Sequence, residues 1–132
     1  MSNMASLLFW SLRDVNWVGF YLSDGARLCL GPFHGRPACT VLDPDRGVCS
    51  AAVRERKTMN IPDVEAFPGH IACDAASRSE LVVPLILGGE VWGVLDVDSP
   101  HPDRFDAETQ HLLERAAAIL VSRLGDGIVF PS

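Results

Sequence analysis

Residues 81–99, LVVPLILGGEVWGVLDVDS, decide the fold of this 132-residue chain. Two apolar runs, residues 81–87 and 91–97, flank Gly88-Gly89-Glu90. Glycines between two apolar runs are typical of a β-hairpin, since glycine adopts the left-handed backbone that a tight turn requires. The stretch therefore predicts two paired antiparallel strands.

Acidic residues interrupt this apolar hairpin. Asp96 and Asp98 stand two apart in the second run, and Glu80 directly precedes the first. Side chains two apart on a strand share a face, and a buried carboxylate costs free energy unless a cation or a hydrogen-bond donor meets it. A face of acids would hold a ligand ammonium, and one acid kept protonated by burial could donate a proton to a leaving oxygen. Alternatively the strand end turns toward water, which is plausible for Asp98 beside Ser99-Pro100.

A second hairpin is predicted near the N-terminus. Residues 15–22 are rich in aromatic and β-branched types, Ser23-Asp24-Gly25 signals a turn, and residues 26–30 form the returning strand. Trp17 and Tyr21 share one face of the first strand. They could wall an apolar pocket, although filling the core is the default role of buried aromatic side chains.

The rest of the chain supplies helices and loops. Helices are expected over residues 3–13, 47–57 and 105–124, and a short strand over 58–61. Residues 31–45 and 62–77 are loops with several prolines and glycines, and loops of this length in a small domain are usually functional. The order predicts an α+β fold with a central antiparallel sheet, helices on one face and long ligand-covering loops on the other.

Length and charge narrow the classes of function. Residues 1–132 fit one domain, because two cores would each be too small. The net charge is −6, and the basic residues do not cluster into a stripe along the sequence. Both features argue against nucleic acid or an anionic membrane as partner. No apolar stretch is long enough to span a bilayer and no signal peptide is visible, so we expect a cytoplasmic protein.

Four cysteines remain to be explained: Cys29, Cys39, Cys49 and Cys73. In a reducing compartment they are unsuited to permanent cross-links, and His70 with Cys73 is the only close His/Cys pair, so a structural metal site is not expected. Cys39 and Cys73 fall in the two loops, an arrangement that suits a nucleophile and a resolving thiol. Cys29, inside a strand, is expected in the core.

Cys49 has two readings that the sequence leaves open. It stands in the first turn of the helix predicted from Gly47, where amide groups and the helix dipole would stabilise a thiolate. Equally, it is a small residue buried on an amphipathic helix.

Several segments together resemble a known family. They are NWVGFY (16–21), GPF (31–33) with PAC (37–39), GVC (47–49), FPGHIACD (67–74) with SRSE (77–80), and GVLDVDS (93–99). The chain resembles the free methionine-R-sulfoxide reductases, single GAF-domain enzymes, from about residue 3 to residue 124. Generic GAF sensor domains share the strand pattern but not these three cysteines.

The resemblance assigns roles to the thiols. It implies that Cys73 attacks the sulfoxide sulfur and becomes a sulfenic acid, that Cys39 resolves this to a disulfide, and that thioredoxin reduces the disulfide. Cys49 matches a third family cysteine that could share either role. The helix dipole favours Cys49 as the more acidic thiol, whereas the resemblance places Cys73 beside the acids. We favour Cys73, because a nucleophile must first reach the bound sulfur.

The resemblance also implies the substrate site. Glu80, Asp96 and Asp98 match the family's substrate-binding acids, and Trp17 and Tyr21 match its aromatic wall. Neither a cofactor nor a metal is implied, and a homodimer is left open. The first helix is shorter than the family's upstream helical segment. The alternative is a GAF module that senses a small molecule, or mediates an interaction, without chemistry.

Overall fold

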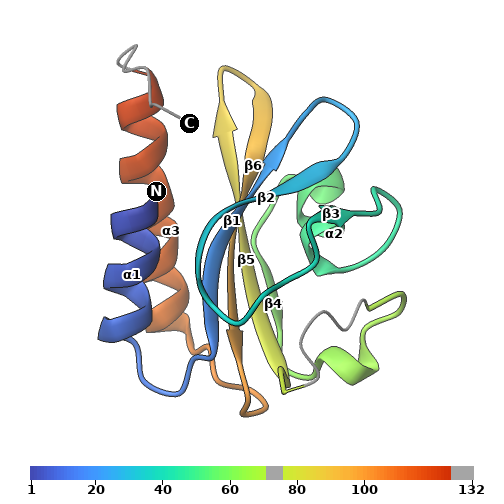
Figure 1. The fold of residues 1–132 in the computed structure, drawn as a ribbon, viewed down its shortest axis with the longest axis vertical. Helices are drawn as coiled ribbons and strands as arrows, with labels where there is room; N and C mark the ends of the chain where they lie inside the picture. The colour runs from blue at the N-terminus through green and yellow to red at the C-terminus, as the bar shows by residue number, and fades with distance from the viewer. Residues whose placement is uncertain (71–75, 126–132) are drawn as a thin grey trace.

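A six-stranded antiparallel sheet runs through the centre of the protein (Figure 1), in the strand order β3-β2-β1-β6-β5-β4. This computed structural model describes residues 1–70 and 76–125. The strands are β1 (Trp17–Ser23), β2 (Leu28–Gly35), β3 (Val41–Leu42), β4 (Met59–Ile61), β5 (Ser79–Leu87) and β6 (Glu90–Ser99). Both predicted hairpins are present. In the β5–β6 turn Gly88 and Gly89 have φ of 60° and 83°, the left-handed values that explain the two glycines.

Helices cover both faces of this sheet. On one face α1 (Ser2–Ser11) packs against β1 and β2, and α3 (Ala107–Gly125) packs against β5. On the other face lie α2 (Val48–Glu55), the loops and the short 3-10 helix η1 (Val64–Ala66). The predicted α+β class is confirmed. One detail differs: α2 shares the face with the loops, because its buried side chains pack against β4, β5 and β6 on that side of the sheet.

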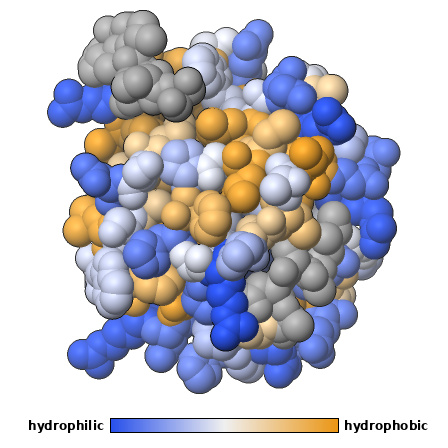
Figure 2. Space-filling view, viewed as in Figure 1, coloured by the Kyte–Doolittle hydropathy of each residue, from blue (hydrophilic) through white to orange (hydrophobic). Residues whose placement is uncertain are grey.

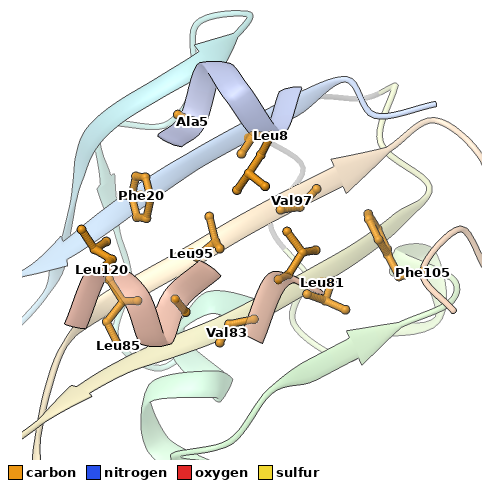
Figure 3. Packing of buried hydrophobic residues seen from close by; sticks show 13 residues of the cluster. Ala5, Leu8, Phe20, Leu81, Val83, Leu85, Leu95, Val97, Phe105 and Leu120 are labelled. Carbon is orange, nitrogen blue, oxygen red and sulfur yellow. The ribbon is translucent and has the colours of Figure 1, made fainter. Parts of the chain in front are cut away.

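The main core lies between the sheet and the α1/α3 layer (Figure 3). Even-numbered residues of β1 and odd-numbered residues of β5 and β6 point into it, which leaves the alternate residues for the opposite face. The fully or nearly fully buried members from the strands are Val18, Phe20, Leu81, Val83, Leu85, Leu95 and Val97. Leu8 of α1 and Leu120 of α3 close over them.

Strand β2 is longer than the sequence predicted. It continues to Gly35, whereas the expected strand ended at Leu30 and the expected loop began at Gly31. The register explains the difference, since Tyr21 pairs with Leu30 and Gly19 with Phe33, so that two residues of β2 oppose one of β1. Such a bulge accommodates a proline inside a strand. Pro32 therefore marks an irregular strand here, not its end.

Cys29 was expected in the core, and this expectation is wrong. Its side chain is half-buried on β2, and its Sγ lies 3.8 Å from Asp24 Oδ2 at the exposed β1–β2 turn. The strand is close to the edge of the sheet, with only the two-residue β3 outside it, so alternation on β2 does not guarantee burial.

Polar residues gather along the rim of the face seen in Figure 2 and apolar residues across its middle. Within residues 1–70 and 76–125, no helix has the length and apolarity needed to cross a bilayer.

Replacing Leu95 with alanine should lower the free energy of unfolding by about 2–5 kcal/mol, because Leu95 is fully buried in the central strand β6 and the cavity cannot collapse easily. Urea unfolding measures the change. Leu7→Ala is the matched control: Leu7 is 67% exposed on α1, so its change should stay within about 0.5 kcal/mol. Similar losses for both variants would mean that the main core lies elsewhere.

Candidate active site

The strand register gathers the predicted site residues on the face opposite the main core. Asp98 of β6 pairs with Trp17 of β1 on one side and with Glu80 of β5 on the other. Asp96 belongs to the next row on the same face, between Gly19 and Val82. Two acids that are distant in sequence from the aromatic residues thus become their neighbours. The structure brings together Trp17, Glu80 and both aspartates, a grouping that the family resemblance implied.

A pocket opens on this face, with about 590 Å³ of empty space counted out to the solvent. Its lining comes from β1, the β2–β3 loop, the start of α2, β5 and β6. The lining residues are Trp17, Tyr21, Pro37, Ala38, Leu42, Arg46, Gly47, Val48, Cys49, His70, Ser77, Glu80, Asp96 and Asp98.

The acids in the pocket are buried and close together. Glu80 is 8% exposed and Asp96 is 5% exposed. Burial raises the pKa of both carboxyls well above the usual range, and repulsion raises each further, from Asp96 on Glu80 and from Asp98 on Asp96. Asp96 Oδ1 has no hydrogen-bond partner in the described part of the chain. A cation at this point would relieve both the repulsion and the missing contact.

Cys49 lies in the first turn of α2, as expected, and directly above these acids. Its thiol is 5% exposed and its Sγ lies 4.0 Å from Glu80 Oε2. Burial raises the pKa of the Cys49 thiol well above its usual value, and the negative charges of Asp96 and Glu80 raise it further. Of the two readings of Cys49 that the sequence left open, these features favour the small buried thiol over the stabilised thiolate. A charge at a helix N-terminus is stabilised by about 0.3–1 kcal/mol, which is less than one pKa unit. Full burial can shift a pKa by several units, so burial outweighs the helix dipole.

The aromatic wall is a stack of three rings. Trp17 lies between Phe33, at a centroid distance of 5.4 Å, and Tyr21, at 5.8 Å. Gly19 makes this arrangement possible, because a Cβ there would collide with Phe33 Cβ and with the edge of the Trp17 indole. The small residue in the middle of β1 thus lets the indole lie across its own strand.

The polar ends of two wall residues hold the loop that carries Cys39. Trp17 Nε1 donates to the carbonyl of Arg36 at 3.1 Å, and Tyr21 Oη donates to the carbonyl of Cys39 at 2.9 Å. Burial raises the pKa of the Tyr21 phenol, and repulsion by Asp96 adds to this, so the hydroxyl remains a donor. The wall therefore fixes the backbone at one of the predicted redox cysteines.

The predicted thiols differ in state and in how far the structure describes them. Cys39 is disulfide-bonded, while Cys29 and Cys49 are free. Cys73, the predicted nucleophile, lies in residues 71–75, outside the described residues.

Sequence reasoning did not assign three polar residues of the lining: Arg46, His70 and Ser77. Arg46 is exposed at the mouth, next to the α2 N-terminus, and is the only Arg or Lys among the described lining residues. Partial burial lowers the pKa of His70, which keeps its imidazole neutral at pH 7. The position of Arg46 directly before Gly47 was one available signal, since a cation there extends the positive end of α2. His70 and Ser77 stand in the segments FPGHIACD and SRSE, which carry the family resemblance.

The fold and the pocket define a class. The family model described as "GAF domain" matches residues 4–124, almost the whole described chain. The six-stranded antiparallel sheet with its helices is thus the fold of a GAF domain.

Individual proteins narrow the class further. The chain is 46% identical over 120 residues to the free methionine-R-sulfoxide reductase of Escherichia coli, covering 91% of this chain and 73% of that protein. The reduced form of fRMsr of Staphylococcus aureus is 49% identical with a TM-score of 0.90, over 93% of this chain and 80% of that one. The Neisseria meningitidis free methionine-R-sulfoxide reductase in complex with its substrate is 42% identical with a TM-score of 0.91, over 97% and 78%. The chain belongs to the GAF domain family and, within it, to the free methionine-R-sulfoxide reductase group, which confirms the resemblance found in the sequence.

Asp96→Asn should make the protein more stable at pH 7 than the parent. The raised pKa of Asp96 means that the folded state holds its proton more tightly than the unfolded chain, so the stability of the parent falls as pH rises above about 4, the unfolded pKa. Asparagine cannot ionise, so this loss is removed, and each pKa unit of elevation corresponds to about 1.4 kcal/mol.

Urea unfolding between pH 4 and pH 8 measures the difference, which should grow with pH. Glu90→Gln is the control, since Glu90 is exposed on the β5–β6 hairpin, and it should leave the pH dependence of the parent unchanged. A less stable Asp96→Asn at pH 7 would show that the carboxylate is compensated in the folded protein.

Proposed function

We propose that this protein reduces free methionine-R-sulfoxide to methionine with electrons from its own cysteine thiols. The observation that carries the proposal is the buried group of Glu80, Asp96 and Asp98 beneath an aromatic wall, in a chain of this reductase group. Such a group favours a ligand that brings a positive charge and an apolar body.

A free amino acid fits the pocket with both of the charged groups on its α-carbon. Its α-ammonium would lie against the acids, where Asp96 Oδ1 offers an unused acceptor. Its α-carboxylate would meet Arg46 and the N-terminal turn of α2, whose first amides have no partner in the helix. The methyl sulfoxide end would rest on Trp17 and Tyr21. The charged α-carbon end and the methyl sulfoxide end of the ligand thus bind different parts of the pocket, which fixes the direction of the sulfoxide.

The reaction then needs two thiols and one reductant. The Cys73 thiol attacks the sulfoxide sulfur and accepts its oxygen as a sulfenic acid, and methionine leaves. The Cys39 thiol attacks the Cys73 sulfur, which releases the oxygen as water and forms a disulfide. A dithiol protein of the thioredoxin type returns both thiols by exchange. The disulfide-bonded state of Cys39 supports its role as the resolving thiol.

The acids have a second role in this scheme. Burial raises the pKa of Glu80 and of Asp96 and so favours the protonated form of each carboxyl, which is the form that can donate a proton to the sulfoxide oxygen. Protonation makes the sulfur more electrophilic at the moment the thiol attacks. Burial and the neighbouring carboxylates raise the pKa of the Cys49 thiol, so Cys49 stays a neutral thiol unless a cation binds beside it. The cytoplasm, with its thioredoxin and reducing conditions, suits such a cycle.

Free methionine-R-sulfoxide should be reduced at least about tenfold faster than its N-acetyl derivative, because losing a charge-assisted hydrogen bond in a buried pocket costs roughly 1.5–3 kcal/mol. The assay follows NADPH oxidation with thioredoxin and thioredoxin reductase. The S epimer serves as the control for binding without reaction. Comparable rates on the free and acetylated compounds would contradict the proposed function.

Single-turnover experiments separate the two thiols. Cys39→Ser should release about one methionine per chain and then stop, because its sulfenic acid has no partner, while Cys73→Ser should release none. Cys29→Ser, whose thiol lies at the exposed β1–β2 turn, should turn over like the parent. Repeated turnover by Cys73→Ser would move the nucleophile to Cys49.

A further inference from the structure

One group of side chains in the pocket has a property that amino-acid binding does not use. The ligand atoms of Cys49, Glu80 and Asp96 all lie within 4.8 Å of one another, and all three residues are buried. The Cys49 sulfur is a soft donor, and the two carboxylates are hard ones. Recognition of the ammonium requires only the carboxylates. The Cys49 sulfur is therefore an additional possible metal ligand close to them.

A second observation points to a missing cationic ligand. Asp96 is 5% exposed, lines the pocket, and its Oδ1 has no partner among the described residues. A buried carboxylate oxygen normally has a hydrogen bond or a cation. Tyr21, which lines the same pocket, does not supply this hydrogen bond, because its hydroxyl donates to the Cys39 carbonyl instead. The acceptor is therefore left for a ligand.

We propose that Cys49, Glu80 and Asp96 form a binding site for a zinc-type divalent cation, which occupies the pocket in place of the substrate. The donor set is one thiolate and two carboxylates, three protein ligands with a fourth position for water, as in open zinc sites. The exclusion of substrate rests on the proposed function, whereas the binding of the cation does not. The site differs from a His70/Cys73 pair, which the sequence already disfavoured.

Movements of up to about 1.4 Å complete this site, because its three ligand atoms lie within 4.8 Å of one another. With ordinary zinc–sulfur and zinc–oxygen bond lengths, ligand atoms around a tetrahedral ion lie about 3.4–3.6 Å apart. The Cys49 sulfur and Glu80 Oε2 lie 4.0 Å apart, so they approach by a few tenths of an ångström. On binding, the Cys49 S–H bond breaks and its proton passes to the buffer, as does any proton held by the two carboxyls. No oxidation or reduction takes place.

The test uses Cd²⁺, whose bond to a thiolate gives an ultraviolet charge-transfer band. A chain carrying Cys29→Ser, Cys39→Ser and Cys73→Ser keeps Cys49 as its single thiol, so any band reports that residue. We expect one Cd²⁺ per chain with a saturating band, and no band when Cys49→Ser is added. Adding Asp96→Asn in place of Cys49→Ser should weaken binding by about tenfold or more, while Glu90→Gln should not change it.

Circular dichroism of each variant shows whether it is folded. If the single-thiol chain does not fold, the same titration is made on Cys49→Ser and Cys29→Ser in the otherwise unchanged, oxidised chain, where only the former should lose the band. A folded single-thiol chain without a band, or affinity unchanged by Asp96→Asn, would overturn the proposal. In the reductase assay, Zn²⁺ should raise the apparent KM for the sulfoxide. Cd²⁺ binding without activity would refute the proposed function alone.

Discussion

The alternation of side chains along β1, β6 and β5 is the constraint on which the rest of the molecule depends. These three strands are covered on both faces, so each carries a core half and a pocket half on the same backbone. A slip of one residue would move Asp96 into the place of Leu95 and send a carboxylate into the apolar layer under α1 and α3. Burial of the apolar residues therefore fixes the pairing register of the three strands, and this register determines where the acids lie.

The acids on the pocket face lower the stability of the protein and at the same time favour the binding of a cation. Glu80 and Asp96 are buried beside each other and beside the Cys49 thiol, in surroundings that oppose every negative charge. Such a group lowers the stability of the empty protein and is tolerated because Leu81, Leu95 and Val97 bury fully on the other face of the same strands. The same disfavoured charge is what a cationic ligand would relieve. The repulsion and burial that lower the stability of the protein thus make the pocket selective for positively charged ligands.

Local patterns carried most of the fold prediction. The glycines between two apolar runs identified the β5–β6 hairpin, and regular apolar spacing identified α3, because both signals come from neighbouring residues. Strand β2 was cut short since a bulge opposite β1 is a property of two strands, invisible in Pro32 itself. The sharing of a face by Asp96 and Asp98 followed from period two. The state of Cys49 did not follow from its helix position, because the acids that set its pKa come from strands far along the chain.

Hydrogen bonds from the aromatic wall couple two properties that enzyme engineering usually treats separately. Trp17 and Tyr21 shape the pocket with their rings and anchor the Arg36–Cys39 backbone with their polar atoms. A smaller residue at either position would widen the pocket and release the loop at once. Redesign for bulkier sulfoxides has more freedom at Ala38 or Leu42, which line the pocket and leave those anchors intact. The evolvable part of this pocket is its aliphatic side.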